Sequence, residues 1–402
     1  MPGPILTFDR RVLNGYYKQE KPASTFLRRI FFPVTNLLDT PKVEKHFKKG
    51  KRRVAPFVSP KVGGKIITND GFDIHQNAIP TVGVCVKLSA EDEAFTIGLG
   101  QNPYSSNPYA KVGEYLKDQS DMITRKEQLI IADLLTTGKF TVQEVAPDGT
   151  NAGAAYEIDF KMSNLFQAGV GEFADTKIWT DPTSDPIADL KKMRLSIWKN
   201  AGINPRNTVL SPDMATAFIN HPKVKPYLDI KRIETGLIKP EILEPGVLYL
   251  GYINELGMDI YEYQDWYLDE TTNKDKEILP EGSVIMGTTG NEMLYGAIAI
   301  YDRKSDGSLG EPTVYKGERV ADSWREGNKS RNLETMAKPL PYPTDIDGFA
   351  YLNLKTVAGV SMASIVEKEE VAEAEEVVEE ATTGNEAIEE AGGDNKKVRK
   401  GK

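Results

Sequence analysis

Histidine and cysteine, which often act as general base, nucleophile or zinc ligand, are few in this chain. They are His46, His75, His221 and Cys85. The histidines are scattered, and none stands in an HxxxH or HExxH arrangement that would place two ligands on one face of a helix. We expect each histidine to lie on the surface or in a loop. Cys85 stands within an apolar run, and we expect it to be a small buried hydrophobic residue.

Motifs for cofactor chemistry are incomplete. The stretch "IGLGQN", residues 97–102, lacks the third glycine of a dinucleotide fingerprint, and no GxxxxGK[ST] phosphate loop occurs. With 59 acidic residues, pairs of carboxylates arise without any functional reason. We therefore predict a protein that is not an enzyme and that holds no cofactor or metal. A cytoplasmic hydrolase using a carboxylate pair within residues 185–290 stays open as an alternative.

The composition is that of a globular protein, with 40% hydrophobic and 27% charged residues in 402. The net charge of −9 is uneven, because Glu367–Lys402 holds 12 acids and 6 bases and leaves 47 acids and 44 bases before it. That near-neutral body shows no global basic field for nucleic acid. A single cysteine excludes an internal disulfide framework, and no signal segment or run of 18 apolar residues occurs. These features predict a soluble protein made in the cytoplasm, without a membrane partner.

Residues 1–53 predict an arm that packs on another molecule. Its one dense apolar patch is "FLRRIFF", residues 26–32, and such a segment cannot bury enough of itself to offset its ordering entropy. The basic run "KHFKKGKRR", residues 45–53, fits a solvated stretch, and it also fits a patch that faces a polyanion. In the second case the candidate DNA-facing residues are Lys48, Lys49, Lys51, Arg52 and Arg53.

Residues 54–88 predict a long two-stranded β excursion. The run "IPTVGVCVKL", residues 79–88, is rich in β-formers and places Val82, Val84 and Val86 on one face. An isolated hairpin is only marginally stable in water, so a neighbouring subunit must cover one that projects. Lys61 and Lys65 in this segment could form cross-links between subunits, although solvated lysines are far more common.

A helix of about 30 residues is predicted over 108–137. Asn107 and Pro108 supply an N-cap and a first helical residue, and Gly138 ends the helix. At 1.5 Å per residue the helix is roughly 45 Å long, which suits a spine lying across a sheet. Its apolar stripe consists of Val112, Leu116, Ile123, Ile130 and Leu134.

The rest of the chain alternates between helical and strand patterns. Residues 185–290 predict a compact α/β domain inserted into a larger one, which consists of residues 89–184 and the returning strands of residues 291–360. Eleven glutamates fall within residues 367–390, so the tail, residues 361–402, is expected to be disordered. Val371, Ala374, Val378 and Ala381 follow helical spacing, which leaves a short partner helix open as an alternative.

Six stretches in this order resemble one known family, the lambda-type major capsid proteins of tailed bacteriophages, or phage capsid E family. The resemblance covers roughly residues 20–355. The stretches are "TFLRRIFF" (25–32), "PFVSPKVGGKII" (56–67), "RKEQLIIADLLTTGKF" (125–140), "TVLSPDMATAFINHPKVKPYL" (208–228), "LPEGSVIMGTT" (279–289) and "MLYGAIAIYD" (293–302). The acidic tail beyond residue 365 departs from the family pattern.

The resemblance implies an α+β fold, the tailed-phage capsid fold. It has an N-terminal arm (1–53), an extended β loop (54–88), a peripheral domain (89–184 and 291–360) with spine helix 108–137, and an axial domain (185–290). The arm residues expected to contact neighbouring subunits are Phe26, Leu27, Ile30, Phe31 and Phe32. Those of the loop are Phe57, Val58, Pro60, Lys61, Val62, Ile66 and Ile67. The spine core consists of Leu116, Ile123, Ile130 and Leu134.

The resemblance also implies a function. Many copies of a major capsid protein would form pentamers and hexamers of an icosahedral shell around double-stranded DNA, assembled in the host cytoplasm and carried in the virion. The expected partners are the chain itself, a scaffold, a portal, a decoration protein and packaged DNA contacted without sequence specificity. An encapsulin-type bacterial compartment, which shares the fold, is the alternative. The long arm and the "FVSPKVGG" stretch argue against it.

Overall fold

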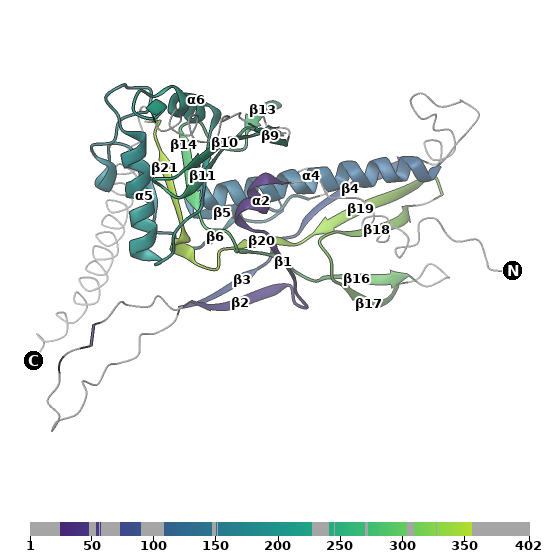
Figure 1. Ribbon diagram of the computed structural model, residues 1–402. Helices are drawn as coiled ribbons and strands as arrows, with labels where there is room; N and C mark the ends of the chain where they lie inside the picture. Colours follow the sequence, from purple (N-terminus) through teal and green to yellow (C-terminus); the bar gives the residue numbers. More distant parts are fainter. Residues whose placement is uncertain are drawn as a thin grey trace, which may run out of the picture. The chain divides into compact units, whose positions relative to one another are not determined.

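Helix α4 is the longest element in the part of the chain that the structure describes, and it spans Pro108–Thr137 as predicted (Figure 1). The computed structural model describes residues 25–47, 54–55, 57, 73–89, 108–146, 150, 152–226, 241–244, 246–269, 272–303, 309–326 and 328–355. The predicted N-cap Asn107 lies outside these residues. Gly138 follows the helix with a φ of 74°, and its amide donates a hydrogen bond of 2.9 Å to the carbonyl of Leu134. Glycine adopts this left-handed conformation without strain, so it ends the helix.

The apolar stripe of α4 is buried. It consists of Val112 and the four predicted core residues Leu116, Ile123, Ile130 and Leu134. Burial extends beyond the stripe to polar residues. The amide of Gln119 donates to the carbonyl of Leu333 at 2.8 Å, and Gln128 accepts a 2.9 Å hydrogen bond from the hydroxyl of Tyr263. Buried polar groups are stable when they are bonded in this way. The helix is therefore enclosed on more than the one face that its apolar spacing marks.

A seven-stranded mixed sheet forms the centre of the α/β part, in the order β7-β21-β14-β8-β11-β10-β9. Helix α5 packs against β21, and α6 packs against β8 and β11. Along β14, Val284 and Met286 belong to the core cluster with α5 and α6, whereas Ile285 belongs to the cluster with α4. Both faces of the sheet are thus covered, which explains why every residue of β8 and β14 is buried. The strands of this sheet are β7 Leu165–Gln167, β21 Phe349–Asn353, β14 Ser283–Gly287, β8 Asn207–Leu210, β11 Met258–Tyr263, β10 Val247–Ile253 and β9 Glu241–Glu244. The helices are α5, Pro186–Asn200, and α6, Pro212–Asn220.

This sheet extends past the predicted axial domain of residues 185–290. Strands β7 and β21 come from the segments that were assigned to the peripheral domain, and β21 pairs with β14 through five residues in register. The chain divides into two units, Met1–Leu354 and Lys355–Lys402, so the axial and peripheral parts belong to the same unit. The predicted boundary fails because pairing between strands distant in sequence leaves no local signal.

Smaller sheets complete the unit. They are β1-β15-β20, β18-β19-β4, and the pairs β2-β3, β5-β6, β12-β13 and β16-β17. Their strands are β1 Val34–Leu37, β2 Lys42–Phe47, β3 Asp73–Ala78, β4 Val82–Ser89, β5 Lys139–Val142, β6 Tyr156–Asp159, β12 Trp266–Asp269, β13 Lys274–Glu277, β15 Glu292–Tyr295, β16 Ile298–Arg303, β17 Leu309–Tyr315, β18 Val320–Glu326, β19 Ser330–Ala337 and β20 Pro339–Tyr342. The short helices are α2, Phe26–Phe31, and the 3₁₀ turns Gly171–Phe173 and Ile346–Gly348.

The β excursion is built differently from the prediction. Its two strands are β2 and β3, so the first strand comes from within the predicted arm, residues 1–53. Strand β4 does not join it and pairs instead with β19 over eight residues. Val82, Val84 and Val86 are half-buried, and the alternation of a strand then leaves Cys85 exposed. The expectation of a buried Cys85 is therefore wrong.

The apolar patch of the arm packs inside its own chain. Phe26, Leu27, Phe31 and Phe32 are all at most 1% exposed, and Ile30 is half-buried. The expectation that neighbouring subunits cover these residues is wrong for the four buried side chains. The rings of Phe31 and Phe32 lie 5.6 and 5.8 Å from the ring of Phe349, and the missing side chain of Gly287 leaves the space that Phe31 and Phe349 fill. Helix α2 is thus part of the folded subunit.

Candidate assembly surfaces

A buried ionic cluster fixes helix α2 to helix α4. Glu127 is only 1% exposed at its side chain, and Nη1 of Arg319 donates a hydrogen bond of 2.7 Å to its Oε1. The hydroxyl of Tyr295 donates to the same oxygen at 3.0 Å. Nη1 of Arg28, from α2, lies 3.9 Å from Oε2 of Glu127, and its Nη2 lies 3.1 Å from Glu318. The positive charges of two arginines therefore balance the negative charges of two glutamates.

Burial opposes the charge on Arg319, but the adjacent Glu127 carboxylate outweighs it and raises the pKa of the guanidinium. The pKa of Tyr295 is also raised, first by burial and then by Glu127, so its hydroxyl keeps the proton that it donates. The contacts to Glu127 join three elements and make the cluster a structural clamp, although Oε2 of Glu127 and Nε of Arg319 are buried without a hydrogen bond within the described residues. The signal for this cluster in the sequence is a glutamate on the apolar stripe, between Ile123 and Ile130, which we did not single out.

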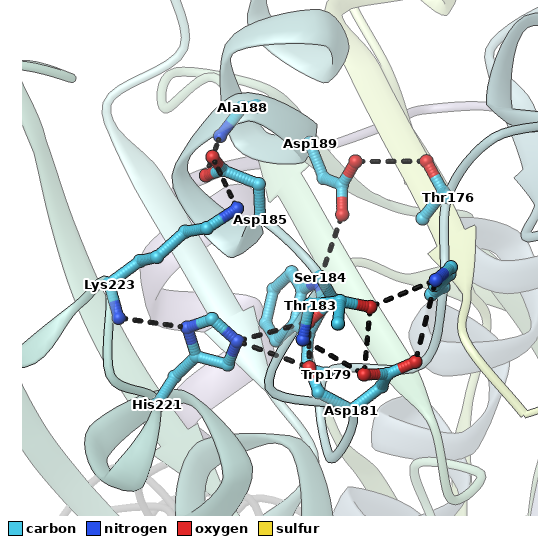
Figure 2. A network of polar contacts seen from close by, with 11 residues as sticks. Thr176, Trp179, Asp181, Thr183, Ser184, Asp185, Ala188, Asp189, His221 and Lys223 are labelled. Carbon is cyan, nitrogen blue, oxygen red and sulfur yellow. Dashed lines mark hydrogen bonds and ion pairs between the residues drawn. The ribbon is translucent and has the colours of Figure 1, made fainter.

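A second polar network joins the start of α5 to the end of α6 (Figure 2). His221 lies in the loop that follows α6, as expected, and its side chain is buried there, with only 2% exposed. Its Nδ1 accepts a hydrogen bond of 3.2 Å from the backbone N–H of Lys223, which places the ring proton on Nε2. Nε2 then donates to Oγ of Ser184, 3.1 Å away. His221 cannot take a proton from Ser184 in this arrangement, and the pair is structural.

The carboxylates of the same network also have structural partners. Asp189 is buried and accepts hydrogen bonds from Trp179 at 3.1 Å and Thr176 at 2.9 Å; burial raises its pKa. Oδ1 of Asp185 accepts the Ala188 N–H at 3.1 Å, and its Oδ2 pairs with Lys223 at 3.1 Å. Asp185 thus caps α5 directly before Pro186, the first residue of the helix. Across the residues that the structure describes, no group of three or more His, Cys, Asp and Glu could hold a metal ion.

Large apolar side chains with no cover lie between β2 and β3. Phe57 and Val54 are 108% and 91% exposed, the highest values among the large hydrophobic residues described. Of the predicted loop contacts, Phe57 is described; Val58, Pro60, Lys61, Val62, Ile66 and Ile67 lie outside the described residues, as do Lys48, Lys49, Lys51, Arg52 and Arg53. Two exposed apolar side chains three residues apart in one segment offer a surface for contact with a partner.

Further exposed apolar residues come in pairs on one helix, on one strand or on two paired strands. Leu195 and Trp198 lie on the outer face of α5, Trp266 and Leu268 on β12, and Tyr301 and Val314 on the paired strands β16 and β17. Isolated exposed apolar residues are common on any protein, but pairs that share one face make a surface for contact. No helix in the described ranges is long and apolar enough to cross a membrane.

Known proteins resemble this chain over nearly its whole length. Residues 9–352 match the family of phage major capsid protein E. The major capsid protein of Enterobacteria phage P21 is 22% identical over 360 residues, which cover 87% of this chain and 99% of that protein. The major capsid protein of Escherichia phage N15 is 24% identical over 347 residues, covering 81% of this chain and 93% of that one.

A solved structure that resembles this fold is also that of a capsid protein. The crystal structure of a protein described as a prophage capsid protein, from Escherichia coli CFT073, superposes with a TM-score of 0.57 at 16% identity, covering 87% of this chain and 99% of that one. This likeness confirms the predicted α+β tailed-phage capsid fold. The chain therefore belongs to the phage major capsid protein E family and is a major capsid protein, a structural subunit of the virion.

Proposed function

We propose that many copies of this chain close into an icosahedral head around double-stranded phage DNA. In this head, the segment between β2 and β3 of each copy lies against a neighbouring copy. A scaffold and a portal are the further partners that we infer for this head, and a decoration protein is left open. Sequence similarity to the major capsid proteins of phages P21 and N15 supports the formation of a head. The exposed apolar residues of the segment support its contact with a neighbouring copy.

The observation that carries the proposal is the exposure of Phe57 and Val54. Covering a phenylalanine side chain stabilises by about 1.5–3 kcal/mol. One such contact is weak between two free subunits. In a closed shell every subunit touches several neighbours, so each contact becomes effectively intramolecular and the sum is large. This explains how a subunit can fold alone and still form a durable container.

Contact with DNA in this proposal is unspecific. The basic run at residues 45–53 supplies the cations, and the near-neutral body avoids strong repulsion between copies. Binding through phosphate contacts alone weakens steeply with salt and carries no base preference.

Expression of the chain together with the head genes of its phage tests the proposal. We expect closed particles of megadalton mass by sedimentation and electron microscopy. Deletion of residues 60–70 should leave folded subunits, with unchanged circular dichroism, that form no stable particles. A chain that yields only monomers or small oligomers under these conditions would contradict the shell, and intact heat-resistant particles from the deletion would contradict the contact.

A further inference from the structure

A groove of about 590 Å³ opens between α5 and the turn that joins β10 to β11. One wall is a stripe of α5, Lys191, Leu195 and Trp198, with Arg194 beside it. The other wall consists of residues 204–206, from the connection that precedes β8, and residues 256–257 of the turn. The clamp around Glu127 and the segment between β2 and β3 lie in other elements, so the groove is a separate feature.

The groove is cationic. Nη1 of Arg194 donates a hydrogen bond of 2.9 Å to the carbonyl of Leu256. Neither Arg194 nor the exposed Arg206 forms an ion pair with a carboxylate in the described ranges. Lys191 pairs with Glu255 across the rim. Planar guanidinium groups bind carboxylates through two parallel hydrogen bonds. The groove therefore has donors in place for an acidic ligand.

The groove is also partly apolar. Leu195 and Trp198 are 59% and 50% exposed, and they stand one turn apart on the face that carries Arg194. A small inorganic anion would leave these side chains uncovered. The ligand that matches both properties is a peptide segment in which carboxylates alternate with small or branched apolar side chains.

The chain itself contains such a segment. Glutamate occupies positions 369, 370, 373, 375, 376, 379 and 380, and Val371, Ala374, Val378 and Ala381 interrupt them at spacings of three and four residues. No base stands between residues 369 and 381. We propose that this Glu-rich segment, residues 367–390, of one copy binds the α5 groove of a second copy. The inference rests on the proposed function, because a shell holds copies at high effective concentration.

Photo-cross-linking in the full-length chain tests this inference. A benzophenone-bearing amino acid replaces Leu195 in normal copies, which are mixed during assembly with isotopically heavy copies that lack it. We expect cross-linked pairs of normal and heavy peptides whose heavy partner falls within residues 367–390. The yield should drop about tenfold at about 0.5 M salt, where exposed charges are screened. The double variant Arg194→Ala and Arg206→Ala should lower it by a similar factor, whereas Lys199→Ala, on the same helix but outside the groove lining, should not.

Cross-links within single copies, cross-links to other segments, or a yield unchanged in the double variant would each overturn the inference. The same measurement on unassembled subunits at matched concentration should give a much lower yield. Electron microscopy of each sample reports particle formation independently. A failure of the shell is therefore distinguished from a failure of the groove, since intact particles without the predicted cross-links contradict the groove alone.

Discussion

The guanidinium of Arg319 donates a 2.7 Å hydrogen bond to the carboxylate of Glu127, and their side chains are 8% and 1% exposed. Arg28 approaches the other carboxylate oxygen from α2. One glutamate on the spine helix α4 therefore connects the arm helix to the segment that precedes β18. The arm of this capsid subunit is held by a charge pair as well as by its phenylalanines.

Replacing Glu127 tests this clamp. Glu127→Gln leaves the buried guanidinium of Arg319 without a carboxylate, while Arg28 keeps Glu318, and we expect the free energy of unfolding of the free subunit to fall by about 3 kcal/mol. The control is Glu318→Gln, since Glu318 is 35% exposed and its pair with Arg28 is worth less than about 1 kcal/mol. Urea denaturation of unassembled subunits measures both. Equal effects of the two variants would contradict a buried clamp.

The packing of the arm in its own chain gives a second prediction. Phe31→Ala removes a fully buried ring from the main core cluster and should destabilise the free subunit by about 3–5 kcal/mol. Leu37→Ala, at a half-exposed position of β1, should cost less than about 1 kcal/mol. If Phe31→Ala affected assembled particles but left the unfolding of free subunits unchanged, the arm would be covered by neighbours after all.

Gly287 shows how tightly the arm fits. A Cβ at this position would lie 2.4 Å from Phe349 and 2.9 Å from Phe31, closer than atoms can approach. Gly287→Ala should therefore destabilise the subunit by about 1–3 kcal/mol, even though alanine suits a strand better than glycine does. The matched control is Gly83→Ala in β4, where the nearest atom would lie at an ordinary 3.4 Å. Thermal unfolding of both variants checks this, and a stabilised Gly287→Ala protein would disprove the close packing.

The cap of α5 predicts a dependence on pH. Burial opposes ionisation of Asp185, but the Ala188 N–H and the Lys223 ammonium outweigh it and lower its pKa. A carboxylate whose pKa is lower in the folded state stabilises the protein above its unfolded pKa of about 3.9, and that contribution disappears as the pH falls through the folded value. The melting temperature of the wild type should exceed that of Asp185→Asn at neutral pH, and the difference should shrink below about pH 4. A difference independent of pH would contradict the role of the charge.

The elements with strong local signals were predictable from the sequence. Pro108 and Gly138 mark the ends of α4, Ser211-Pro212 marks the start of α6, and Gly257 marks the turn between β10 and β11. The order of motifs along the chain was sufficient to identify the family and its fold. These features depend on residues that are close together in the sequence.

The errors came from pairings between distant residues. Nothing local in "FLRRIFF" distinguishes a patch covered by another copy from one covered by β14 and β21 of the same chain. The pairing of β21 with β14 carries the sheet past the predicted domain boundary. The pairing of β4 with β19 fixes which side chains of β4 are covered and leaves Cys85 exposed. The buried roles of Glu127 and His221 depend on partners from other elements, which only the folded chain brings together.

The central claim is that a neighbouring copy covers the segment between β2 and β3. The most direct measurement is the rate at which a maleimide labels Phe57→Cys in a Cys85→Ser background, in free subunits and in assembled particles. Phe57 is fully exposed in the single chain, so free subunits should react as fast as unfolded chain. Assembled particles should react at least about tenfold more slowly, because the contact excludes the reagent. Equal rates in particles and free subunits would contradict the account.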